Sequence, residues 1–367
     1  MPPDRKPPRS ICLLRLSALG DVCHCVALVR SLQAAWPDCR ITWIIGKLEH
    51  QLVGDLPDVE FIVVDKKQGR TGLAALRRQL AGRRFEVLLL AQVSLRAGLV
   101  SMLIRAERRV GFDRARSREG HGLFINERIP ARPDQHQALA LLSFASHLGA
   151  AVDNVDRAPP IPAAAREFAR KHQPDPNRAV LISPASSHSG RNWNAQAYAQ
   201  VADWIVQETA RPVILIGGPS KAEQALGEAI MARTLVPIVN LIGQDTLKQA
   251  LAMLERSACL ITPDAGPAHF AAALGKPVVG LYAATWSRRS GPLGSLEHCV
   301  DRFPEAARQF LGKEPQQLRW GRRLEMPGVM DLISPEMVIE RLGRVLGQDG
   351  PDNASEAPNQ PSAMPRP

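Results

Sequence analysis

The chain has 367 residues, enough for two domains, and its 45% hydrophobic and 22% charged residues exclude a disordered or fibrous protein. No apolar run approaches the roughly 20 residues of a membrane-spanning helix, so we expect any membrane association to be peripheral. The formal net charge of +10 favours anionic partners. Because no RNA-binding, zinc-finger or basic-zipper signature is present, phosphorylated small molecules or an anionic membrane surface are favoured over nucleic acid.

The first half of the chain alternates short apolar runs with helical patterns. Continuous apolar runs of this kind predict strands that are buried on both faces, as in a parallel sheet covered by helices. The predicted strands are 10–15, 41–45, 61–64, 87–90 and 109–112, and the predicted helices are 22–36, 72–81, 97–105 and 135–148. A Pro-rich stretch at 154–163 predicts a linker after them.

The second half repeats this pattern. Its predicted strands are 179–183, 212–216, 238–241, 260–262 and 278–282, and its predicted helices are 195–208, 222–232, 247–256, 269–274 and 335–346. The sequence therefore predicts an α/β protein of two Rossmann-like, doubly wound domains, spanning 10–160 and 161–347, that face each other across a cleft. The ends, 1–9 and the Pro-, Asn- and Ser-rich 348–367, are predicted to be disordered.

The cysteines indicate a compartment and not a metal site. None of the six forms a C-x-x-C pair, and four lie in apolar stretches, which suits a reducing environment. Cys23 and Cys25 would diverge on a helix, so core packing is favoured over zinc binding. The first ten residues lack the apolar core of a secretory signal, and we expect a cytoplasmic protein.

A phosphate-binding turn is predicted within 259–292. A buried strand ends near Thr262, and a helix whose first turn holds Pro267 runs to a stop at Gly275. The free N–H groups and the positive dipole end of such a helix suit a phosphate. The same residues also fit an ordinary strand–helix–strand crossover whose small side chains serve close packing.

The loop 15–22 is the second candidate, because it follows the first strand at the edge of the sheet where α/β proteins bind ligands. It lacks the G-x-G-x-x-G fingerprint, which disfavours a nicotinamide-dependent enzyme. By itself, Asp21 in this loop favours a helix cap, a common role for Asp after Gly.

Two further loops carry groups that suit a nucleotide. In 183–193, Ser186 and Ser187 can donate to phosphate oxygens, and Arg191 can neutralise a departing diphosphate. After the Gly-rich turn 217–219, Glu223 could accept from ribose hydroxyls. A capped loop with a solvated arginine is the alternative for 183–193.

Together these motifs resemble glycosyltransferase family 9, the heptosyltransferases of lipopolysaccharide core assembly. The segment 264–277 is similar to the family's D-x-G-P-x-H motif with its following helix, and 17–22 is similar to its N-terminal S-x-x-G-D-V signature. The loop 183–193 ends in Arg-x-Trp where the family usually has Lys-x-Trp. The resemblance extends over 10–346.

The resemblance implies the two-domain architecture called GT-B, an ADP-heptose donor, and no metal or other cofactor. Asp21 would be the catalytic base, and Arg191 would stabilise ADP as it leaves. The implied donor-binding residues are Ser186, Ser187, Glu223, Asp264, Ala265, Gly266 and His269.

The acceptor side rests on 92–96 and 116–119, which look like elements of heptosyltransferase I, the enzyme that acts on the acidic sugar Kdo. One residue departs from that pattern, since Val93 stands where the family usually has Gly. The implied acceptor-binding residues are Ser17, Arg96 and Arg118, with Lys66 and Lys67 facing lipid A phosphates. For the two lysines, a solvated basic face is the alternative.

We therefore expect an inverting transferase that moves L-glycero-D-manno-heptose from ADP-heptose to the Kdo region of the lipopolysaccharide inner core. Its partners would be the ADP-sugar and a lipid A–Kdo acceptor at the cytoplasmic face of the inner membrane, with no nucleic acid. The alternatives are heptosyltransferase II, another family 9 enzyme with a different sugar or acceptor, and a non-catalytic scaffold that binds nucleotide sugars.

Overall fold

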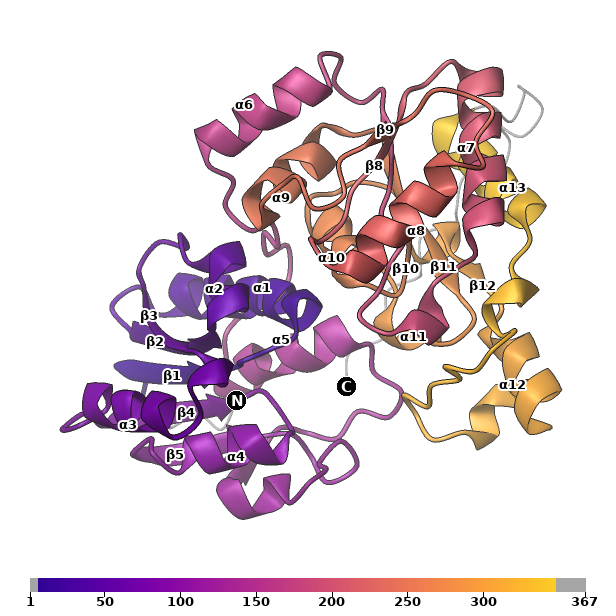
Figure 1. The fold of residues 1–367 in the computed structure, drawn as a ribbon. Helices are drawn as coiled ribbons and strands as arrows, with labels where there is room; N and C mark the ends of the chain where they lie inside the picture. Colours follow the sequence, from indigo (N-terminus) through magenta and orange to yellow (C-terminus); the bar gives the residue numbers. More distant parts are fainter. Residues whose placement is uncertain (1–5, 348–367) are drawn as a thin grey trace.

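The structure is a computed structural model. It describes residues 6–347, except for the side chains of Lys66 and Arg70. These residues form two separate sheets of six parallel strands each, with helices on both faces (Figure 1). The predicted α/β fold with two Rossmann-like units is therefore confirmed. The predicted disorder of 348–367 and of the first five residues concerns segments outside the described part.

The first sheet lies in the N-terminal half and has the strand order β3-β2-β1-β4-β5-β6. Its strands are β1 (Ser10–Leu14), β2 (Arg40–Gly46), β3 (Val59–Val64), β4 (Phe85–Leu90), β5 (Ala106–Gly111) and β6 (Glu127–Arg128). Its helices are α1 (Leu19–Ala35), α2 (Lys47–Val53), α3 (Gly69–Gln79), α4 (Leu95–Ser101) and α5 (Gln137–Leu148). The short helix α2 had no counterpart among the predicted elements.

The second sheet has the order β12-β11-β10-β7-β8-β9. Its strands are β7 (Val180–Ile182), β8 (Val213–Leu215), β9 (Val239–Asn240), β10 (Cys259–Pro263), β11 (Val278–Tyr282) and β12 (Val300–Asp301). Its helices are α6 (Ala163–His172), α7 (Ala195–Thr209), α8 (Lys221–Met231), α9 (Leu247–Arg256), α10 (Gly266–Ala273), α11 (Ser287–Ser290), α12 (Phe303–Leu311) and α13 (Pro335–Leu346). Helices α6, α11 and α12 were not predicted.

Alternate residues of each strand enter different cores, as the continuous apolar runs predict. On β1, Ile11 and Leu13 pack in the cluster that contains α1 and α5, whereas Cys12 and Leu14 pack toward α3 and α4. The cluster on the α1 side continues into the second unit, where it includes residues of α9 and α10. The two halves thus share one apolar core across their interface.

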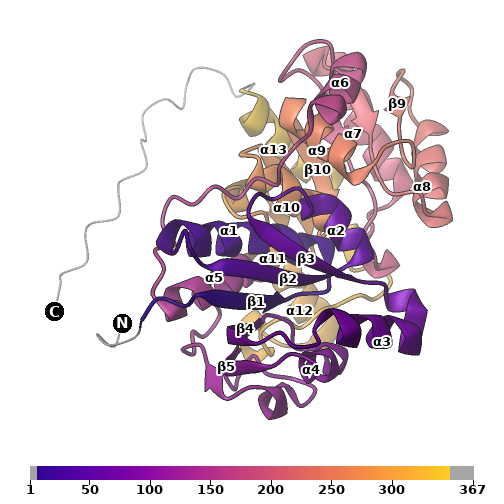
Figure 2. The same cartoon turned by 90° about the vertical axis from the view of Figure 1, so that its left-hand side faces the viewer.

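The topology decides where ligands can bind. In each sheet, successive strands are added first on one side of the first strand and then on the other. The strand order therefore reverses between β1 and β4 and between β7 and β10. A crevice opens at the carboxyl ends of the strands at such a switch point. Helices α1 and α10, which follow β1 and β10, pack against each other (Figure 2), so the loops after these two strands lie on facing sides of the interface.

The expected boundary at residues 160 and 161 falls in the connection between α5 and α6 and stays a prediction. Within residues 6–347, no helix combines the length and the apolar character that crossing a membrane requires.

Candidate active site

The close approach of α1 and α10 brings Asp21 to the N-terminus of α10. A Cβ atom on Gly20 would lie 2.5 Å from Cδ2 of His269, so only glycine allows this distance between the helices. The Cys23 thiol donates to the carbonyl oxygen of His269 (3.8 Å) one turn further along. Residues that are far apart in sequence therefore share one site.

Asp21 lies inside the first turn of α1 and does not cap the helix. The N-cap is Ala18, and no side chain caps this end. The Asp21 carboxylate instead pairs with the buried Arg15 guanidinium and accepts a hydrogen bond from Nε2 of Gln137 (3.2 Å). Its side chain is still 25% exposed, so a substrate hydroxyl can reach the oxygens that these partners orient.

Arg191 and Asp264 also meet, as the sequence predicts for two residues of one site. The Arg191 guanidinium lies 3.7 Å from Oδ2 of Asp264 and donates to its carbonyl oxygen (3.5 Å). The hydroxyl of Ser290 donates to Oδ2 of Asp264 (3.3 Å). Asp264 is therefore held by a cation and a hydroxyl at the end of β10.

Glu325 is a site residue that the sequence did not reveal. It accepts from Nε of Arg191 (2.7 Å) and lies 2.5 Å from its second guanidinium nitrogen. Because it comes from the irregular segment between α12 and α13, no strand–loop–helix context marked it. Two carboxylates, those of Glu325 and Asp264, thus fix the guanidinium beside α10.

The N-terminus of α10 offers one backbone donor and the positive end of the helix dipole. Ala265 is its N-cap and makes no side-chain capping bond. Pro267 has no N–H, and the N–H of Ala268 donates to the carbonyl oxygen of Ala265 (3.2 Å), which leaves the N–H of Gly266. With Arg191 beside it, this end of the helix suits a diphosphate.

The hydroxyl-rich loop differs in detail from the sequence-based picture. The Ser186 hydroxyl donates to the carbonyl oxygen of His188 (2.8 Å) and accepts from its N–H (3.2 Å), so it stabilises the loop itself. Asn192 holds the same loop by accepting from the Ser186 N–H (2.7 Å). Ser187 is exposed, which leaves it the better placed of the two serines to meet a ligand.

Glu223 closes the Gly-rich turn at the end of β8. Its carboxylate accepts from the N–H of Gly218 (2.6 Å) and from the Ser220 hydroxyl (3.0 Å). Asp245, after β9, is a second acidic residue that the sequence did not single out. Burial, with a smaller contribution from the charge of Glu223, raises its pKa to about 7.

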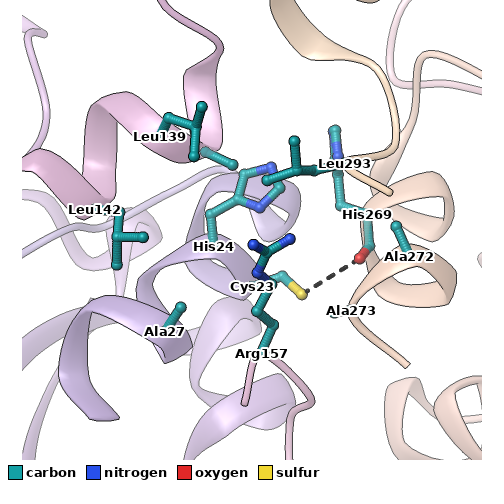
Figure 3. Close-up of a pocket in the computed structure, with 11 residues that line it drawn as sticks. Cys23, His24, Ala27, Leu139, Leu142, Arg157, His269, Ala272, Ala273 and Leu293 are labelled. Carbon is teal, nitrogen blue, oxygen red and sulfur yellow. Dashed lines mark hydrogen bonds between the residues drawn. The ribbon is translucent and has the colours of Figure 1, made fainter. Parts of the chain in front are cut away.

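Three histidines meet between α1, α5 and α10. The His24 ring lies edge-on to that of His269, with ring centroids 4.6 Å apart (Figure 3). The centroid of the His24 ring lies 6.4 Å from that of His136. His24 and His269 border a cavity of about 20 Å³, which has room for about one water molecule. Burial lowers the pKa of all three, and that of His136 falls to about 4, so they are neutral at pH 7.

The predicted acceptor residues lie on the N-terminal side of this interface. The Ser17 hydroxyl accepts from Nε2 of Gln92 (3.4 Å). The N–H of Leu95 donates to Glu119 (2.8 Å), which ties the start of α4, with Arg96, to the loop that carries the exposed Arg118. Lys67 is exposed after β3, whereas the side chain of Lys66 lies outside the described part.

Within residues 6–347, no three His, Cys, Asp or Glu side chains are grouped so as to hold a metal ion. The expectation of a transferase without a cofactor stays a prediction.

Comparisons with known proteins agree with this arrangement. Residues 73–317 match the family model described as glycosyltransferase family 9 (heptosyltransferase). The lipopolysaccharide core heptosyltransferase OpsX of Haemophilus influenzae is 35% identical over 350 residues, which cover 94% of this chain and 99% of that protein. Lipooligosaccharide heptosyltransferase 2 of the same organism is 22% identical over 92% of this chain and 100% of its own length.

Solved structures show the same fold. A family 9 glycosyltransferase from Veillonella parvula superimposes with a TM-score of 0.74 at 22% identity, over 93% of this chain and 98% of that one. Escherichia coli ADP-heptose heptosyltransferase II gives 0.68 at 20% identity, over 93% and 99%. The family match and the OpsX relative together carry the assignment: this chain belongs to glycosyltransferase family 9, the heptosyltransferases, and is a glycosyltransferase.

Proposed function

We propose that this enzyme transfers heptose from ADP-heptose to the Kdo region of the lipopolysaccharide inner core, with inversion at the anomeric carbon. The observation that carries the proposal is that the first turn of α1, which holds the partly exposed Asp21, packs against α10, where a Cβ on Gly266 would lie 3.8 Å from Cβ of Leu19, while Arg191 pairs with Asp264 just before α10. The donor is supported by solved relatives, among them an E. coli heptosyltransferase described with ADP. The acceptor is supported by the core heptosyltransferase OpsX.

The reaction is a single displacement. The acceptor hydroxyl oxygen attacks the anomeric carbon while its proton passes to Asp21, and the bond from that carbon to the ADP oxygen breaks with its electrons leaving on ADP. Arg15 and Gln137 orient the carboxylate. Arg191, the N–H of Gly266 and the positive dipole end of α10 offset the charge that builds on the leaving diphosphate.

The remaining site residues have binding roles in this proposal. Ser187, Glu223, Asp264, Ala265 and Gly266 line the donor side, with Ser186 shaping its loop and His269 packing beneath it. Ser17, Arg96, Arg118, Lys66 and Lys67 serve the acceptor, at the cytoplasmic face of the inner membrane. Because protein cations supply the positive charge at the diphosphate, we expect transfer to persist in EDTA.

The test is a mass-shift assay with ADP-heptose and Kdo-lipid A, using the wild type and Asp21→Asn. We expect a gain of one heptose with the wild type and a loss of rate of roughly 10²–10⁴-fold in the variant, since general-base catalysis contributes about that factor. Binding of ADP should be unchanged, which serves as the control for folding.

Other outcomes have defined meanings. Equal transfer by both proteins would remove Asp21 as the base. Transfer only to an acceptor that already carries one heptose would assign the second heptosyl step. A folded protein that binds ADP but transfers to neither acceptor would contradict the proposed reaction and favour a nucleotide-sugar-binding scaffold.

A further inference from the structure

Helix α11 of the C-terminal unit lies against the start of α5 in the N-terminal unit (Figure 1). Two consecutive residues at this end of α5 make hydrogen bonds across the contact. Nε2 of His136 bonds to the carbonyl oxygen of Gly291 (3.0 Å), just after α11. Oε1 of Gln137 accepts from the Arg289 guanidinium (3.3 Å). The contact between the units therefore reaches the same glutamine whose amide donates to Asp21.

Arg289 fixes the orientation of the Gln137 amide. Nε2 of Gln137 donates to Oδ1 of Asp21 (3.2 Å), while its Oε1 faces Arg289. A guanidinium can only donate and a carboxylate can only accept. The reverse orientation would therefore turn the amide oxygen toward the carboxylate and the NH₂ group toward the guanidinium, and both hydrogen bonds would be lost. With Arg289 in place, Gln137 presents a donor to Asp21.

The C-terminal unit holds Arg289 in place. The Tyr282 hydroxyl donates to the carbonyl oxygen of Ser290 (3.2 Å), which anchors the end of α11 to β11. Gly321 packs on the arginine side chain, since a Cβ atom there would lie 2.6 Å from Nε of Arg289. In the part of the chain that the structure describes, Arg289 forms no salt bridge, so no carboxylate competes with Gln137 for this guanidinium.

Helix α11 contacts the donor side of the site as well. The Ser290 hydroxyl donates to Oδ2 of Asp264 (3.3 Å), the carboxylate oxygen that lies 3.7 Å from the Arg191 guanidinium. Adjacent residues of one helix thus serve the two sides of the site. Ser290 contacts the donor side directly, and Arg289 reaches the proposed base through one amide.

We propose that Arg289 is a positioning residue for the transfer, which acts through Gln137 to orient the Asp21 carboxylate toward the acceptor hydroxyl. The inference rests on the proposed function, in which Asp21 is the base. Arg15 orients the same carboxylate from within the N-terminal unit, whereas Arg289 does so from the C-terminal unit. The base is therefore fully oriented only while α11 contacts α5. Because a misplaced reacting group slows the chemical step, losing Arg289 should lower kcat more than it weakens donor binding.

The first test is a kinetic double-mutant cycle with ADP-heptose and the acceptor that the wild type uses. Arg289→Met should lower kcat by about 10- to 100-fold and leave the KM for ADP-heptose within about twofold, and Arg289→Lys, which keeps a donor, should recover most of the loss. In a Gln137→Ala background, Arg289→Met should change kcat by less than about twofold, because its route to Asp21 is already gone. Arg288→Met removes an exposed arginine from the same helix and should behave like the wild type. Equal losses in both backgrounds would overturn the inference.

The second test needs no transfer. Exchange of the Gln137 side-chain NH₂ protons with water is followed by NMR of the ¹⁵N-labelled protein, and the signals are assigned by their loss in Gln137→Ala. We expect exchange about fivefold faster in Arg289→Met, because a hydrogen bond that holds the amide is gone, and an unchanged rate in Arg288→Met. An unchanged rate in Arg289→Met would overturn the inference. If the wild type transfers heptose to no acceptor, the proposed function fails, and the exchange rates alone decide whether Arg289 holds Gln137.

Discussion

Arg191 shows how the charge of a residue and its geometry can be separated. Glu325 and Asp264 hold its guanidinium beside α10, and only 11% of the side chain is exposed. If the role of Arg191 is to offset charge on the leaving diphosphate, a lysine should serve nearly as well. A lysine keeps the positive charge but lacks the planar guanidinium that can donate two parallel hydrogen bonds. The family's usual lysine at this position is consistent with that expectation.

We predict that Arg191→Met lowers kcat about 100-fold, because one preorganised charge at a developing anion contributes roughly that factor. Arg191→Lys should stay within about tenfold of the wild type. Steady-state kinetics with saturating ADP-heptose measures both variants. If Arg191→Lys were as slow as Arg191→Met, the geometry of the guanidinium and not its charge would be the essential feature.

Among the elements, the contact of α1 with α10 holds the two units together at the site. Gly20 permits this contact because the His269 ring occupies the place of a side chain. The residues of the α1–α10 contact belong to the apolar cluster shared by both units. A substitution that alters this contact is therefore expected to affect the packing of both units.

We predict that Gly20→Ala destabilises the protein by about 1–3 kcal/mol, the usual cost of overpacking a tight contact. Chemical denaturation measures the loss. In a His269→Ala background the same substitution should cost much less, because the ring that it strikes is gone. Equal costs in the two backgrounds would mean that the Gly20–His269 contact is not the cause.

At the scale of the whole molecule, the histidines between the units make stability depend on pH. His136 donates through Nε2 to the carbonyl oxygen of Gly291 (3.0 Å) and accepts at Nδ1 from the N–H of Ala138 (3.2 Å), which is the neutral form. His24, His269, Arg157 and Arg289 surround it, and none of them favours its protonation. Its pKa, about 4, lies below the ordinary value of 6.5.

A lowered histidine pKa stabilises the folded protein above about pH 6.5, and this stabilisation is lost as pH falls toward 4, because the unfolded chain binds the proton first. For His136 we predict a loss of about 2 kcal/mol between pH 7 and pH 5. Calorimetric unfolding at several pH values measures it. His136→Gln keeps a donor for Gly291 but does not titrate, and it should flatten this part of the profile. An unchanged slope in the variant would contradict the assignment.

Much of this protein follows from local sequence. Short continuous apolar runs between helical patterns favour strands buried on both faces, which predicts the two parallel sheets. Loops directly after such strands lie at the carboxyl edge, which made them candidate site loops, whereas the roles of Asp21 and Asp264 came from the resemblance to glycosyltransferase family 9. Helices α2 and α11 escaped prediction because runs of 7 and 4 residues carry little periodicity. Helices α6 and α12 were missed although both have a clear amphipathic pattern.

The tertiary structure decided which partners these residues have. Arg15, Gln137 and Glu325 surround the proposed base and cation. Arg15 lies in the candidate loop 15–22, but its pairing with Asp21 was not predicted, and the local pattern around Gln137 and Glu325 gives no sign of their roles. The same holds for the three histidines. Secondary structure depends on the pattern of residues close together in the sequence, so local sequence predicts it. The contacts named above join residues far apart in the sequence, and they exist only because α1 packs on α10 and the segment before α13 reaches the site.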